Sequence, residues 1–333
     1  MKQNSPLKSA WLGMDPAIAQ LLVFTVLIFV TMSVLSPTKF LGYYNFESIT
    51  YVMPELGILS IAMMVAMLTG GIDLSVVGIA NLAAITAGLY FRSPAVADAI
   101  AAGGAAMILH TIAAVCIALA VGLFAGLVNG ILIARLGIIP ILATLGTGQV
   151  FAGLAVVATG GPALVGFPTS WAWIGSGKIL GLATPFWVML AVAVVIAFLL
   201  KRTTLGVNLM LIGTNPKAAV FAGVRSARML TYSYMLTGVL SAIAGVLLSG
   251  RTNAAKADFG ASYLLQAVLI AVLAGTNPAG GKGRVLGVLL ALLALMLLSS
   301  GLQMQRVSNF LIDAVWGGFL VLVIAINYLR ARK

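Results

Sequence analysis

The sequence predicts an all-α polytopic membrane protein that crosses the bilayer about ten times, as one transmembrane domain over residues 1–333. Of these residues, 62% are hydrophobic and 8% are charged, whereas a soluble domain carries about 25% charged residues. Only helices and closed barrels span lipid, because every backbone polar group must be satisfied inside the protein. Long apolar runs such as residues 113–134 lack the alternation of barrel strands, so we expect helices.

Ten apolar segments approach the length of about 20 residues that a helical span requires. The first follows Lys2 and Lys8 and has no small-residue cleavage site after it, so we expect an uncleaved span and not a signal peptide. In chain order the expected segments are residues 17–36, 49–68, 76–91, 101–134 (in part), 137–158, 184–200, 229–250, 262–274, 285–300 and 310–328.

Breakers and polar turns delimit the first five segments. Pro37 ends the first segment, and residues 70–75 separate the second from the third. A short polar turn at residues 92–98 follows the third, and Arg135 ends the fourth. The fifth segment begins just after this arginine.

Loops of different character delimit the second five. Residues 160–183 contain Trp171 and Trp173, which are typical of an interfacial or external cap. The sixth and seventh segments flank a long polar connection at residues 201–228. The eighth segment is short, and a Gly-rich turn at residues 275–284 leads into the ninth.

The distribution of basic residues predicts the orientation. With the N-terminus inside, thirteen of the 19 Lys and Arg residues fall on the inner side, which favours cytoplasmic N- and C-termini. The same count places the 201–228 connection in the cytoplasm. Six basic residues fall outside: Lys39, Arg92, Lys178, Arg251, Lys256 and Arg306.

The connection at 201–228 is the longest polar stretch of the chain. It holds five basic residues and no acidic one. Asn215 is a suitable N-cap and Pro216 suits the first helical position, so a short helix is expected over the following KAAVFAGV. We interpret it as a cytoplasmic helix through which another protein drives the membrane part. The Gly-Thr-Asn-Pro sequence that precedes this helix recurs at residues 275–278. This short repeat is weak evidence for a duplication, since two tight turns can use the same residues independently.

The chain offers little material for catalysis or for an energy source of its own. It has seven acidic residues, one His and one Cys, and we find no metal-ligand cluster and no nucleophile–base pair. The GTNPAGGKGR turn departs from a phosphate-binding loop, because Lys282 is misplaced by one position and Gly283 stands where Ser or Thr is needed. We therefore expect no enzyme and no cofactor in this chain. The net charge of +12 is assigned to orienting loops and not to nucleic acid.

Polar residues within apolar segments are the candidates for a translocation pathway. Asp73 after Gly70 and Gly71 indicates either a broken helix that lines a path or a cap for the next helix, in its N-cap position or first turn. Asp313 allows the same two interpretations. Amides such as Asn81 and Asn129 either bridge helices or line a polar path. The remaining candidates are Ser75 and Thr144.

Four segments resemble the permeases of bacterial ABC importers for simple sugars, the group of the ribose, xylose, galactose and autoinducer-2 systems. They are GGIDLSVVG at 70–78, GLVNGILIARLGIIPILATLGT at 126–147, GTNPKAAVFAGV at 213–224, and GTNPAGGKGRVLGVLLALLALMLLSSGL at 275–302. The resemblance covers essentially the whole chain. It departs from the family pattern at Ile79, Val224 and Val207, which leaves the particular sugar open.

The resemblance implies a ten-helix fold similar to the vitamin B12 importer. It also implies two permease copies, identical or paralogous, two ABC ATPase subunits that bind ATP, and a periplasmic binding protein that delivers a monosaccharide or similar small polyol. The family's coupling helix falls on residues 215–224, and the residues expected to couple to the ATPase are Gly213, Asn215, Pro216, Lys217, Ala218, Ala219, Ala222 and Gly223.

Two other classes of function remain open from the residues. One is a stand-alone secondary carrier for a small polar solute, with Asp73 and Asp313 as the only buried acids that could couple protons. The other is a membrane-embedded scaffold subunit. Neither gives a reason for a structured cytoplasmic helix, whereas an importer driven by a separate ATPase does.

Overall fold

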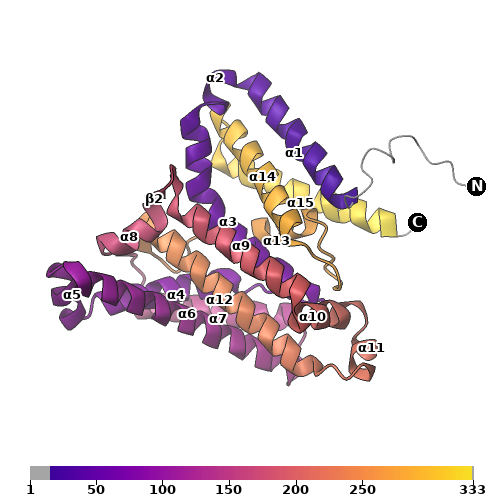
Figure 1. Ribbon diagram of the computed structural model, residues 1–333, viewed down its shortest axis with the longest axis horizontal. Helices are drawn as coiled ribbons and strands as arrows, with labels where there is room; N and C mark the ends of the chain where they lie inside the picture. The colour runs from indigo at the N-terminus through magenta and orange to yellow at the C-terminus, as the bar shows by residue number, and fades with distance from the viewer. Residues whose placement is uncertain (1–15, 332–333) are drawn as a thin grey trace, which may run out of the picture.

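The computed structural model describes residues 16–331, which form a bundle of helices with two very small β-sheets (Figure 1). Within this range, seven helices are long and apolar enough to cross a membrane: α1 (Pro16–Leu35), α3 (Tyr43–Leu68), α6 (Gly104–Ala134), α7 (Pro140–Thr159), α9 (Thr184–Arg202), α12 (Ser226–Thr252) and α14 (Val285–Met304). An eighth span results if α4 (Val76–Phe91) and α5 (Pro94–Ala101), bent by 74°, count as one. A polytopic membrane protein is thus confirmed, with fewer spans by this measure than the ten expected.

The remaining elements are shorter. α13 (Tyr263–Leu273) and the apolar part of α15 (Asn309–Ala331) coincide with expected segments. α2 (Pro37–Phe40), α8 (Thr169–Ser176), α10 (Thr204–Thr214) and α11 (Pro216–Phe221) lie in connections. Each sheet is one antiparallel pair of two-residue strands: β1 (Leu164–Val165) with β4 (Ala254–Ala255), and β2 (Lys178–Ile179) with β3 (Leu182–Ala183).

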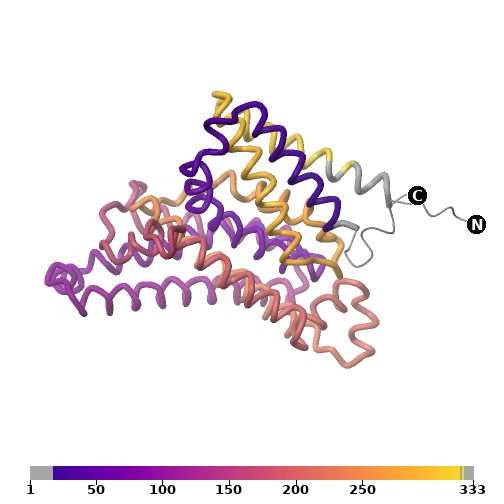
Figure 2. The backbone as a smooth tube through the Cα atoms, turned by 45° about the horizontal axis from the view of Figure 1, so that its top comes forward, coloured from indigo at the N-terminus to yellow at the C-terminus, as the bar shows by residue number. Residues whose placement is uncertain are grey.

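Helices α3 and α12 form the centre of the bundle. Residues 53–68 of α3 are all buried, and α12 packs against α3, α4 and α6. Helices α6 and α7 lie on one side of this centre, and α14 with α1 lies on the other (Figures 1 and 2). The two central helices bury most of their residues because they touch protein on several sides.

A seam of small residues joins α6 to α12. A Cβ atom on Gly122 would overlap the carbonyl oxygen of Gly238, and one on Gly126 would overlap that of Tyr234. Small residues allow two membrane helices to approach at backbone distance. The Gly-x3-Gly spacing of Gly122, Gly126 and Gly130 thus lets α6 pack at backbone distance on α12.

The two ends of the bundle differ in what they carry. The start of α1, the end of α15 and both α10 and α11 lie at one end, which we call the α11 end (Figure 1). The opposite end carries α2, α5, α8 and both β-sheets. The polar connection of residues 201–228 is therefore not one loop with one helix. It contains the end of α9, all of α10, and α11.

Candidate functional site

The break between α3 and α4 is held by a buried carboxylate. Asp73 has no solvent exposure. Its Oδ1 accepts hydrogen bonds from the Ser75 backbone N–H at 3.0 Å and from the Ser75 hydroxyl at 2.6 Å, and its Oδ2 accepts one from the Thr237 hydroxyl of α12 at 2.6 Å. These three donors satisfy a charge that would otherwise be costly at this depth.

Asp73 is not in the N-cap position or the first turn of α4, and that part of the prediction is wrong. Ser75 is the N-cap residue, and the carboxylate reaches its N–H from two residues further out. Gly70 adopts a positive φ of 79°, which lets the chain leave α3 without strain. The broken helix itself, predicted from the two glycines, is confirmed.

The polar contacts continue from the break into α6 and α7. The Asn129 amide donates to the Ser75 hydroxyl at 2.7 Å, and its carbonyl oxygen accepts from the Thr147 hydroxyl at 2.6 Å. The Thr144 hydroxyl accepts from the Leu74 backbone N–H at 3.0 Å. Asp73, Ser75, Asn129 and Thr144, four of the pathway candidates, thus form one cluster with Thr147 and Thr237, which the sequence analysis missed.

Asn81 lies apart from this cluster. Its side-chain amide donates to the carbonyl oxygens of Ala257 and Phe259 at 2.8 and 2.9 Å, and so it ties α4 to the connection after α12. Gly71 belongs beside the cluster, since a Cβ there would overlap the Tyr234 hydroxyl. The two amides therefore bridge segments, which is one of the two roles that their sequence positions allowed.

A second buried acid, Glu55 in α3, escaped the sequence analysis. It is 1% exposed, and its two oxygens accept hydrogen bonds from Arg251 Nε at 2.6 Å and Nη2 at 3.1 Å. The Tyr263 hydroxyl donates to the same carboxylate at 3.3 Å. The charged pair joins α3 to the end of α12, far along the chain. Only the apolar run around Glu55 could have drawn attention to it.

Asp313 is exposed, and the prediction that it is a buried acid is wrong. Its Oδ1 accepts a hydrogen bond from Gln266 Nε2 of α13 at 3.3 Å. Across residues 16–331, no three His, Cys, Asp or Glu residues come together as metal ligands would.

The short helix predicted after Asn215 is present as α11. Asn215 is its N-cap, with the side-chain oxygen accepting from the Ala218 N–H at 3.0 Å, and Pro216 occupies the first turn. The helix is shorter than expected: it ends at Phe221, and Gly223 leaves it with a φ of 79°.

The most exposed residues of α11 are larger than the alanines that the sequence led us to expect as contacts for the ATPase. Ala219 has no exposed surface, because it packs against its own chain. Val220 and Phe221 are instead 62% and 92% exposed. Two other expected contact residues, Lys217 and Ala218, are exposed, as is Ala222. An outside partner of α11 would therefore meet Phe221 and not Ala219.

Backbone atoms of three segments meet next to α11: the end of α3, the end of α10 and the turn before α14. The Gly281 N–H donates a hydrogen bond of 2.9 Å to the carbonyl oxygen of Leu68, which is the last residue of α3. A Cβ on Gly213 would overlap that same oxygen, and one on Gly280 would lie 2.6 Å from the Gly213 Cα. We call this contact of residues 68, 213, 280 and 281 the glycine junction. It brings together the two Gly-Thr-Asn-Pro turns and the start of the break.

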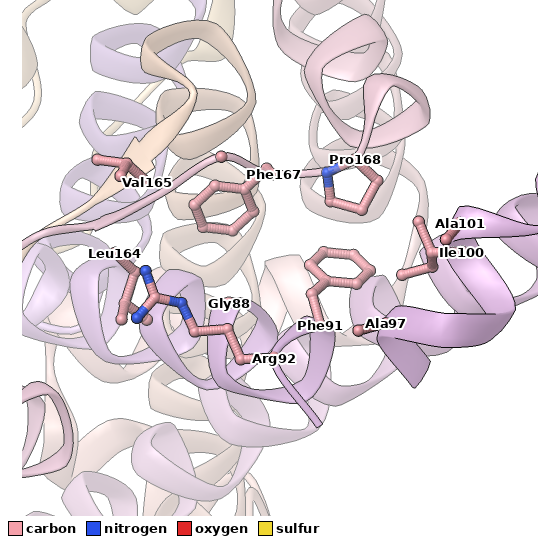
Figure 3. Close-up of a pocket in the computed structure, with 11 residues that line it drawn as sticks. Gly88, Phe91, Arg92, Ala97, Ile100, Ala101, Leu164, Val165, Phe167 and Pro168 are labelled. Carbon is pink, nitrogen blue, oxygen red and sulfur yellow. The ribbon is translucent and has the colours of Figure 1, made fainter. Parts of the chain in front are cut away.

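A small pocket lies at the opposite end of the bundle (Figure 3). It has a volume of about 240 Å³ and is lined by the end of α4, by α5 and by residues 164–168. The Phe91 and Phe167 rings meet edge to face with centroids 6.1 Å apart, and Arg92 stands beside them. The pocket gives this end a cation next to an aromatic surface.

These features describe a polytopic membrane protein whose buried polar contacts join its helices and whose short helix α11 lies at one end. The family model described as "branched-chain amino acid transport system / permease component" matches residues 45–324. The chain belongs to this family, and its motifs are confirmed as those of a simple-sugar type ABC importer permease.

The relatives share one printed name, "Autoinducer 2 import system permease protein LsrD". The protein of Yersinia enterocolitica is 35% identical over 275 residues, which cover 81% of this chain and 79% of the relative. That of Escherichia coli SMS-3-5 is 33% identical over 319 residues, or 94% and 91% of the two chains. That of Photorhabdus temperata is 32% identical over 94% of this chain and 90% of its own. No solved structure matches.

Proposed function

We propose that this chain is the membrane-spanning permease subunit of an ATP-driven ABC importer in a bacterial inner membrane. Its solute is a monosaccharide or a similar small polyol, with autoinducer 2 among the candidates because the relatives carry that name. The observation that carries the proposal is α11, a capped helix that holds Phe221 92% exposed beyond the bundle. A bulky aromatic side chain in that position is typical of a residue that inserts into a partner's pocket.

The proposal includes a topology of ten spans with both termini in the cytoplasm, in a fold of the vitamin B12 importer type. Helices α13 and α15 would add the ninth and tenth spans, with α4 and α5 as one bent span. Arg135, Lys201, Arg202 and the basic residues around α11 all lie at the α11 end, which supports a cytoplasmic location for that end.

Each partner is assigned to a surface of the bundle. A separate ATPase subunit, which binds ATP, docks on α11. A periplasmic binding protein docks at the opposite end, where Arg92 stands beside two phenylalanine rings. A second permease copy, identical or paralogous, and lipid cover the apolar flanks of the bundle. A stand-alone carrier is less well supported, since α11 would then have no role and Glu55 is already neutralised by Arg251.

The test is Phe221→Asp in α11. A carboxylate there opposes burial in an apolar pocket, so we expect loss of ATPase co-purification and of solute uptake, with unchanged insertion in the membrane. The matched control is Leu180→Asp, because Leu180 is 88% exposed at the end away from α11, and it should leave ATPase co-purification unchanged. Co-purification and uptake by the permease complex are the measurements. Wild-type values in Phe221→Asp would contradict docking on α11.

A further inference from the structure

A cavity of about 850 Å³ lies between α3, α13, α14 and α15. Its lining includes Lys39 of α2, Gly42 just before α3 and Gln303 near the end of α14, which places it at the end opposite α11. Leu56 and Met296 lie at its inner end. From Asn45 to Leu56 the wall of α3 spans eleven residues, which at 1.5 Å each makes the cavity roughly 16 Å deep.

The cavity exposes polar side chains that the protein leaves without partners. Ser48, Gln303 and Asn309 line it and are exposed, and within residues 16–331 none of these side chains makes a hydrogen bond. Polar groups of this kind are costly to bury against lipid tails. Their presence therefore indicates that water or a polar ligand fills the cavity.

Asp313 and Gln266 form an acceptor pair on one wall. The hydrogen bond between Asp313 Oδ1 and Gln266 Nε2 is 3.3 Å long. It leaves Oδ2 of the carboxylate and Oε1 of the amide as adjacent acceptors. An ionised carboxylate can only accept hydrogen bonds. This wall is therefore suited to accept hydrogen bonds from hydroxyl groups. Neighbouring hydroxyl groups are the defining feature of a sugar or polyol.

Two aromatic side chains on the same two helices, Tyr263 of α13 and Trp316 of α15, are fixed in place. Trp316 is 6% exposed, and its indole N–H donates to the Ser299 hydroxyl at 3.0 Å. Tyr263 is held by its hydrogen bond to Glu55. The Ser299 hydroxyl accepts from the indole and keeps its own proton for another acceptor. Rigid aromatic surfaces beside a few placed polar groups are the usual composition of a small-molecule site.

We propose that this cavity is a binding site for a small polyhydroxylated solute. Asp313 and Gln266 accept hydrogen bonds from its hydroxyl groups, and Trp316 packs against its carbon skeleton. The inference rests on the proposed function and deepens it, because it places the solute in α13–α15 and away from the Asp73 cluster. That cluster is fully packed and its polar groups bond one another.

A second cavity in the same chain has a more apolar lining. It measures about 420 Å³ between α1, α9 and α14, and Leu190, Val194 and Leu286 are among its mostly apolar lining residues. The contrast in side-chain chemistry is the reason for assigning the larger cavity to a polar solute.

The test measures water access and protection in the purified permease, without any partner. Ser48→Cys is made in a Cys116→Ser background, the protein is placed in lipid nanodiscs, and a charged methanethiosulfonate reagent is added. We expect rapid labelling, slowed by millimolar ribose, xylose or autoinducer 2. Asp313→Asn should raise the concentration needed for protection about tenfold, since hydrogen bonds to a charged acceptor are roughly twice as strong as neutral ones.

Two controls separate the cavity from its surroundings. Leu311→Cys places the thiol on the same helix as Asp313, where Leu311 is 55% exposed outside the cavity, and we expect it to stay unlabelled in lipid. Asp98→Asn removes another exposed carboxylate at the same end, and protection should be unchanged.

The outcomes decide between the two proposals. No labelling of Ser48→Cys would mean that lipid or a second copy fills the cavity, and labelling that none of the three solutes slows would mean a water-filled vestibule only. Either result overturns the binding site. Protection without uptake by the assembled complex would leave the site standing and overturn the importer. Uptake without protection would overturn the binding site and leave the importer standing.

Discussion

Glu55 shows how one side chain can hold two distant helices together inside a membrane. Its carboxylate receives two hydrogen bonds from Arg251, whose own side chain is 25% exposed, and one from Tyr263. Removing one member of a buried pair costs about 3–5 kcal/mol, because the other charge is left unpaired, whereas replacing both is often neutral. The pair therefore gives a clear prediction for stability.

Arg251→Met should lower the thermal unfolding midpoint strongly, since it leaves the buried Glu55 carboxyl group without its cation, with only the Tyr263 hydroxyl as a partner. The double variant Glu55→Gln with Arg251→Met should recover most of the loss, because no isolated charge remains. Lys256→Met is the control, since the Lys256–Asp258 pair is exposed to solvent and such pairs contribute little. The measurement is thermal unfolding in detergent. A double variant no more stable than Arg251→Met would contradict the role given to the pair.

The sequence could identify which polar residues lie in apolar segments but not how they pair. Asp73 was recognised because two glycines break the helix before it, and that break is real. Thr147 and Thr237 gave no signal, because threonine is common in membrane helices and its partners come from distant segments. Asp313 and Glu55 both sit in apolar runs, and only their neighbours in space decide that one is exposed and the other buried.

At the scale of elements, the glycine junction links the break after α3 to the segment that carries α11. The contact is made by backbone atoms of residues 68, 213, 280 and 281. Any displacement of the end of α10 therefore acts directly on the end of α3 and on the loop before α14. Close backbone contact of this kind leaves no room for a side chain.

Gly213→Ala should lower both the unfolding midpoint and solute uptake. The added methyl overlaps the Leu68 carbonyl oxygen, and overpacking of this kind costs about 1–3 kcal/mol. The measurements are thermal unfolding and uptake by the complex. Gly153→Ala in α7 is the control, because a Cβ there meets nothing within 4 Å, and it should leave both values at or above the wild-type level. Equal effects of the two changes would contradict the junction.

Most helices could be predicted as segments, since their apolar length is written in the sequence. The predicted starts are less accurate: α3 begins at Tyr43, six residues before the start expected at residue 49. The contact face predicted for α11 was wrong for a physical reason. Small residues fit equally well against the protein's own backbone or a partner's groove, and Ala219 packs against the protein. In a helix of six residues, periodicity cannot choose between these faces.

At the scale of the whole molecule, the positions of the two ends make the orientation testable. In a Cys116→Ser background, Thr169→Cys at the opposite end should react in intact cells with a reagent that cannot cross the membrane. Ala222→Cys next to α11 should react only after the inner membrane is opened. Both positions are exposed in the structure, so access depends on the side of the membrane alone. The reverse pattern would place α11 outside and exclude docking on a cytoplasmic ATPase.

The glycine seam makes α6 and α12 the pair of helices with the least room to shift against each other. Backbone packed on backbone has no side chains that can change rotamer to absorb a shift, so these two helices move as one body. Helix α15, by contrast, packs chiefly on α13 and α14. If one part of the bundle rocks against the other, the hinge belongs on the α13–α15 side. The 850 Å³ cavity would then change its width with the tilt of these helices, while α6 and α12 keep their arrangement.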